Sequence, residues 1–133
     1  MRKEIFIVSN NKMVAEKYQV VFVDGNLDSV FEKIRDLVHQ GNIILTHPLA
    51  GSIKPHETEY KSVVMEKKEG SVDVDSLRLI ENAIETSKKF VKPVRNWGKE
   101  QERIDKDLMF IDFSLLHTGV EGLGTTLYKI VSI

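Results

Sequence analysis

The sequence predicts an α/β protein, a three-layer Rossmann-like sandwich built on a mostly parallel sheet of about five strands. Short, continuously apolar runs alternate with helical patterns over the first half of the chain, as in successive β-α-β units. Because these runs do not alternate with polar residues, they suit strands that are covered on both faces. The 133 residues contain no linker-like stretch, so residues 1–133 are expected to form a single domain.

Each expected strand is a short apolar run that ends in a polar or glycine-containing turn. The first run ends at Ser9-Asn10-Asn11, which can also cap a short helix over residues 12–18. The second run ends at Asp24-Gly25-Asn26. The expected strands are residues 5–8, 20–23, 42–45, 62–65 and 126–131.

The helix expected over residues 27–38 has the clearest pattern. Asn26 is its expected N-cap, Asp28 lies in the first turn, where the helix dipole favours an acid, and Gly41 is placed for a left-handed C-cap. One stripe of helically spaced apolar residues predicts the buried face: Leu27, Val30, Phe31, Ile34, Leu37 and Val38.

Two further helices are expected, over residues 73–90 and 99–116. The second half of the latter, Leu108–Leu116, is apolar nearly all round, which predicts deep burial or an interface that could join two copies of the chain. Asp112 interrupts this stretch. A buried carboxylate must be paired or hydrogen-bonded, so an anchor to a loop amide or to an arginine is favoured over a catalytic role.

The direction of the fourth strand is open, because the connection before it, roughly fifteen residues, permits either arrangement. If this strand is parallel, the glycine-rich segment 117–124 returns to the rim that carries Asn10, Asp24 and His47, and the closing strand runs antiparallel. If it is antiparallel, the segment lies on the far side. The segment itself is expected to form a helix C-cap and a flexible turn.

Composition narrows the classes of function. The formal net charge is −1, so no overall field favours nucleic acid or an anionic membrane as a partner. The absence of cysteine excludes disulfides, thiolate metal sites and a cysteine nucleophile, and no cofactor is predicted. The first apolar run is too short for a signal peptide or a membrane span. A cytoplasmic, soluble protein is therefore expected.

The most distinctive loop, residues 46–57, follows the third strand without a helix signal between them. Ligands of open α/β sheets bind at the carboxyl ends of the strands, and a glycine-serine pair with a lysine suits a small anionic metabolite. The competing interpretation is an ordinary turn with a solvated lysine. The predicted ligand-binding residues are Asn10, Asp24, Thr46, His47, Gly51, Ser52 and Lys54.

Specific chemistries find little support in this loop. His47 and His56 do not have the spacing of a compact zinc motif, so no metal site is predicted. Ser52 lies outside any Gly-x-Ser-x-Gly elbow, and neither a Walker sequence nor a dinucleotide-binding fingerprint is present. Catalytic residues are thus unknown. His47 is the best candidate, as the acid or base of a small hydrolase or transferase.

Several segments resemble the GrdX family. The most specific is Thr46-His47-Pro48-Leu49-Ala50-Gly51-Ser52, and the others are Phe22–Gly25, Arg35–Gly41, Tyr60–Ser62 and Asp75–Arg78. The resemblance covers most of residues 1–90. It implies a protein encoded beside the glycine, sarcosine and betaine reductase complexes of amino-acid-fermenting anaerobes, and it supplies no catalytic residues.

Those reductases work through selenol and thiol chemistry, which a cysteine-free chain cannot perform. The resemblance therefore implies a component that serves assembly, regulation or small-molecule sensing. Three hypotheses follow: an accessory protein that binds a small anion, a small enzyme that uses His47, and a structural partner subunit.

Overall fold

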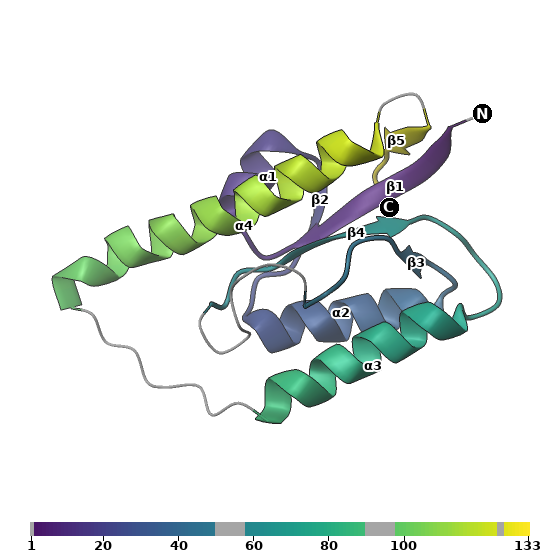
Figure 1. Cartoon of the computed structure of the whole chain (residues 1–133), viewed down its shortest axis with the longest axis horizontal. Helices are drawn as coiled ribbons and strands as arrows, with labels where there is room; N and C mark the ends of the chain where they lie inside the picture. The colour runs from purple at the N-terminus through teal and green to yellow at the C-terminus, as the bar shows by residue number, and fades with distance from the viewer. Residues whose placement is uncertain (1, 50–57, 90–97, 125–126) are drawn as a thin grey trace.

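The computed structural model describes residues 2–49, 58–89, 98–124 and 127–133. In this part of the chain one mixed sheet lies between two pairs of helices (Figure 1). The strands are β1 (Lys3–Ser9), β2 (Val20–Phe22), β3 (Ile43–Ile44), β4 (Ser62–Glu66) and β5 (Tyr128–Ile130). The helices are α1 (Lys12–Lys17), α2 (Leu27–His39), α3 (Val74–Lys89) and α4 (Gln101–Leu123), the last preceded by a 3₁₀ turn, η1 (Gly98–Glu100). The predicted three-layer α/β architecture is confirmed.

The centre of the sheet is β1, in the order β2-β1-β4-β3. β2 and β5 both pair in parallel with β1, β2 at its carboxyl end, where Ser9 faces Phe22, and β5 at its amino end, where Lys3 faces Tyr128. β4 runs antiparallel to β1 on one side and to β3 on the other. Four of the strands thus point one way, and β4 opposes them.

The prediction of a mostly parallel sheet was wrong. The longest pairing, between β1 and β4, is antiparallel, and so is the pairing of β4 with β3. β4 is buried along its whole length, which explains its continuously apolar sequence. Such a sequence reports that both faces are covered and carries no information on direction. The last strand, which was expected to be able to run antiparallel, pairs in parallel with β1.

The antiparallel β4 sets the course of α4. This helix passes Asn11 at the carboxyl end of β1, where the Asn11 amide donates to the Met109 carbonyl over 2.8 Å. It then runs toward β5, at the other end of β1 (Figure 1). The helix is longer than expected, so Gly119 and Gly122 lie within it, and Gly124, with φ of 81°, follows its last turn.

The face of the sheet under α2 and α3 carries the larger apolar core. The helix caps are as predicted: the Asn26 side chain accepts from the Ser29 amide over 3.0 Å, and Gly41 has φ of 109°. A Cβ at Gly41 would lie 2.8 Å from the backbone of Glu69 and Gly70, so the tight approach also requires glycine. Fully buried members of this core include Phe6, Val8, Val30, Phe31, Ile34, Val63, Met65 and Ile80.

The opposite face, under α1 and α4, carries a smaller apolar cluster: Ile5, Ile7, Val14, Val64 and Leu116. Only one stripe of α4 contributes to it. Phe110 is 60% exposed and Leu115 48% exposed on the outer side of the helix. Deep burial of residues 108–116 was therefore a wrong prediction for the single chain.

Candidate functional site

A buried polar cluster fastens α4 to the sheet. One oxygen of Asp112 accepts from the main-chain amide of Ser62 over 3.0 Å. Its other oxygen accepts from the Ser62 hydroxyl over 2.7 Å and from the Asn11 amide over 3.0 Å. The Ser62 hydroxyl also lies 2.7 Å from that of Ser9. These bonds compensate the burial of the carboxylate, and the predicted anchoring role of Asp112, to a main-chain amide, is confirmed.

Beside this cluster lies a depression of about 220 Å³, here termed the inner pocket. Its first wall is made by residues that follow β3 and lead into β4, and its second wall is made by α4. The two walls consist of Thr46, His47, Lys61 and Ser62, and of Asp112, Leu115, Leu116 and Gly119. The pocket thus combines polar side chains, most of them on the first wall, with two leucines of α4, and ligand sites commonly show such a mixture.

Hydrogen bonds to the backbone orient two of its polar side chains. The Thr46 hydroxyl accepts from the Val64 amide over 2.9 Å, so its own proton remains available to a ligand. The exposed His47 ring accepts at Nδ1 from the Leu49 amide over 3.0 Å. The neutral ring therefore bears its proton on Nε2, which can donate a hydrogen bond.

Lys61 is the cation of the inner pocket. Asn10 holds the backbone of Lys61 on both sides. The main-chain amide of Lys61 donates to the Asn10 side-chain oxygen over 2.9 Å, and the main-chain amide of Asn10 donates to the Lys61 carbonyl over 3.4 Å. Burial lowers the pKa of the Lys61 amine, and the charge of Asp112 opposes this effect. An amine in such surroundings is both a charge partner and a potential nucleophile.

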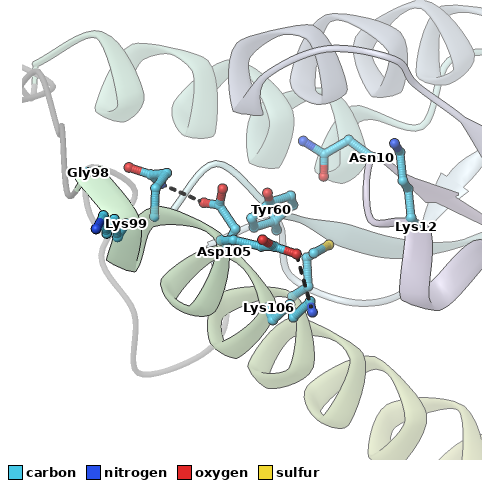
Figure 2. Close-up of a pocket in the computed structure, with 10 residues that line it drawn as sticks. Asn10, Lys12, Tyr60, Gly98, Lys99, Asp105 and Lys106 are labelled. Atoms are coloured by element: carbon cyan, nitrogen blue, oxygen red, sulfur yellow. Dashed lines mark hydrogen bonds and ion pairs between the residues drawn. The ribbon is translucent and has the colours of Figure 1, made fainter.

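A second, wider depression of about 630 Å³, the outer pocket, lies beside the first half of α4 (Figure 2). Its α4 wall carries charges whose partners lie one turn away: Gln101 donates to Asp105 over 2.9 Å, and Lys106 lies 3.5 Å from Glu102. Burial raises the pKa of the Tyr60 hydroxyl, with smaller contributions from Asp105 and Glu59. Because both signs of charge alternate here, the outer pocket has no clear preference for an anion.

The structure distributes the predicted ligand-binding residues over different places. Thr46 and His47 line the inner pocket. Asn10 is buried at the edge of the outer pocket, where its amide donates to the carbonyls of Gly25 and Glu59 over 3.0 and 2.6 Å. The exposed Asp24 lines neither pocket. The other three, Gly51, Ser52 and Lys54, lie outside the described residues.

Sequence reasoning missed Lys61 as a site residue. The available signal was a lysine directly before a strand that is buried along its whole length. Lysine at such a boundary usually reaches solvent with its amine. Only the crossing of α4 over the start of β4 turns this position into a pocket wall.

Two further features of the described residues concern membrane spans and metal sites. No helix among them is both long and apolar enough to cross a bilayer. No three or more histidine, aspartate or glutamate side chains among them are grouped so as to hold a metal ion.

Comparison with known proteins identifies the family. The family model for GrdX-like proteins matches residues 6–121, a span that includes every residue of the inner pocket. No curated protein and no solved structure matches the chain significantly. The chain belongs to the GrdX-like protein family.

Proposed function

We propose that this GrdX-like protein is an accessory protein that binds a small carboxylate-type anion in the inner pocket. The observation that carries the proposal is the position of Lys61 on the wall of a small, partly apolar depression, beside Asp112, which accepts three hydrogen bonds. We assign the role, as the family resemblance implies, to the glycine, sarcosine and betaine reductase system.

The charges of the pocket favour an anion. The carboxylate of Asp112 already accepts three hydrogen bonds, two of them from Ser62, which spread its charge over fixed donors. Lys61 supplies a positive charge at a partly desolvated position, where electrostatic attraction is stronger than in bulk water. Nε2–H of His47 and the Thr46 hydroxyl are further donors on the same wall.

Size and charge also limit the ligand. A volume of about 220 Å³ is below the roughly 300–1,000 Å³ of pockets for drug-sized molecules, so a ligand of a few heavy atoms fits. The nearby Asp112 would repel a second negative charge, which favours a monoanion over a phosphate dianion. Leu115 and Leu116 can cover a short apolar part of the ligand.

Thermal unfolding with added acetate, glycine, phosphate, acetyl phosphate or nucleotides tests the proposal. Acetate is expected to raise the melting temperature of the wild type and to have no effect on Lys61→Gln. Lys106→Gln is the matched control, because Lys106 is an exposed lysine of the outer pocket and its variant should respond like the wild type. No stabilisation by any of these anions, or equal responses of both variants, would remove the support for an anion site.

The alternative of a small hydrolase or transferase has one favourable observation, the His47 ring on the pocket wall. Hydrolysis of p-nitrophenyl acetate tests it. If His47 acts as the base, the His47→Gln variant loses the activity and a His39→Gln variant, changed at an exposed histidine of α2, keeps it. Equal rates for the wild type and both variants would argue against the enzyme.

The exposed outer side of α4 supports a proposal about partners. We infer that a second copy of the chain covers Phe110 and Leu115, since a protein with net charge −1 repels its own copy only weakly. Phe110→Glu should then make the protein monomeric in sedimentation velocity. Phe22→Glu, changed at a phenylalanine of β2 that is 41% exposed, is the control. A wild type that is already monomeric at high concentration contradicts this inference.

A further inference from the structure

We propose that Lys61 forms an imine with a small 2-oxo acid bound in the inner pocket. This inference rests on the proposed function, because it assigns a chemical class to the anion of the same site. It adds a covalent step that simple anion binding does not need.

The first argument is the position of the amine. Asn10 holds the backbone of Lys61 from both sides, so the side chain starts from a fixed point directly before β4. It shares the inner pocket with two other groups that face a ligand, the Thr46 hydroxyl and the His47 ring. A molecule in this volume therefore meets the amine and at least one hydrogen-bond donor together.

The second argument is the reactivity of the amine. Only a neutral lysine attacks a carbonyl carbon, and burial lowers the pKa of Lys61, which increases its neutral fraction at a given pH. The charge of Asp112 opposes this lowering of the Lys61 pKa, and the same charge favours the product of the reaction. A protonated imine is a cation, and the nearby carboxylate stabilises it.

The reaction is balanced within the pocket. The nitrogen lone pair of the neutral amine forms a bond to the carbonyl carbon, and the carbonyl oxygen takes up one amine proton to give a carbinolamine. The carbon–oxygen bond then breaks, and the second amine proton leaves with the hydroxyl group. The products are the imine and one water molecule, and no oxidant, reductant or co-reactant is consumed.

The carboxylate of the oxo acid explains why this carbonyl class is favoured over simple aldehydes. After protonation the imine retains the single positive charge that Lys61 brought, so the attraction for the ligand carboxylate is preserved. Nε2–H of His47 and the Thr46 hydroxyl can receive that carboxylate while the carbonyl carbon meets the amine.

Reductive trapping with pyruvate tests the inference. The wild type is incubated with pyruvate and sodium cyanoborohydride near neutral pH, and mass spectrometry of its peptides gives the modification at each lysine. Lys61 is expected to be modified at least severalfold more than Lys106, because only Lys61 lines the pocket that would bind the oxo acid and burial lowers the pKa of its amine. Excess acetate, which would occupy the pocket but has no ketone group to form an imine, should protect Lys61 alone.

The Lys61→Arg variant separates the two proposals. It keeps the charge and lacks the nucleophile, so it should retain stabilisation by acetate and lose the selective trapping. Equal modification of Lys61 and Lys106 in the wild type, while acetate still stabilises it, overturns the imine and leaves the anion site standing. Absence of any acetate effect on the wild type overturns the anion site itself.

Discussion

The two faces of the sheet differ in what they bury. Under α2 and α3 the buried side chains form one large apolar core, which includes Phe6 and Phe31. Under α1 and α4 the apolar cluster is smaller, the polar group around Asp112 is buried beside it, and α4 walls both pockets. One face therefore supplies most of the buried apolar packing, while the other exchanges part of that packing for polar groups that line a candidate site.

The largest expected effect on stability comes from removing a buried ring from the apolar face under α2 and α3. Phe31→Ala should cost about 3–5 kcal/mol in the free energy of unfolding, because it removes a fully buried ring and leaves a cavity. At protein concentrations low enough to keep the chain monomeric, Phe110→Ala removes the same ring from a position that is 60% exposed and should cost less than about 0.5 kcal/mol. Urea unfolding measures both. Similar costs for the two variants would contradict the comparison.

The next largest effect on stability comes from disrupting the polar cluster around Asp112 on the other face. Asp112→Asn places an amide donor against the Ser62 and Asn11 donors and should cost about 1–3 kcal/mol. Asp107→Asn, at an exposed position of the same helix, should change the stability by less than about 0.5 kcal/mol. The same urea titration gives both values. An Asp112→Asn variant with unchanged stability would show that the cluster does not hold α4.

A smaller effect concerns the contact between α1 and α4. The Tyr18 hydroxyl lies 2.6 Å from Nδ1 of His117, whose ring stacks on Phe113. Tyr18→Phe removes one hydrogen bond and should cost about 0.5–1.5 kcal/mol. A double-mutant cycle with His117→Leu should give a coupling of similar size between the two residues. Strictly additive costs would indicate that the contact contributes nothing.

The smallest effect is a dependence on pH. Burial holds the pKa of Lys61 in the folded protein below its ordinary value of 10.5. At a pH between the folded-state pKa and 10.5, the unfolded chain therefore binds a proton at Lys61 that the folded protein does not. The stability that depends on Lys61 therefore rises with pH in this window. Lys61→Gln has no titrating amine at this position, so the wild type should gain stability relative to the variant as the pH approaches 10.5.

Tyr60 acts in the opposite direction, since its pKa is raised above 10.0 and its stabilising contribution is lost at higher pH. It is present in both proteins and cancels from their difference. A difference in stability between wild type and Lys61→Gln that does not change with pH would contradict the burial of the amine.

Local sequence signals predicted much of the fold. The stripe of α2, its Asn26 cap and the left-handed Gly41 follow from spacing and side-chain chemistry, and the structure confirms them. The direction of β4 could not be predicted, because a long connection and a doubly covered strand are compatible with both directions. That single choice decided where the end of α4 lies.

The site was less predictable for the same reason. Thr46 and His47 were predicted as site residues because they follow the third strand, and they line the inner pocket, while Asp112 was predicted as an anchor because an acid in an apolar helix needs partners. A ligand contact of Asn10 stays a prediction; in the structure its side chain is bound to three backbone groups at the edge of the outer pocket. Lys61 becomes part of a pocket only through the crossing of α4, a tertiary contact that local patterns do not encode.

The most direct test of the central claim is an NMR titration of the ¹⁵N-labelled protein with acetate. We expect the amide signals of Thr46, His47, Lys61 and Gly119 to shift in a saturable manner, and those of Lys99 and Gln101 in the outer pocket to stay in place. The Lys61→Gln variant should show none of these shifts. Shifts confined to the outer pocket, or the absence of saturable shifts, would contradict the assignment of the anion site to the inner pocket.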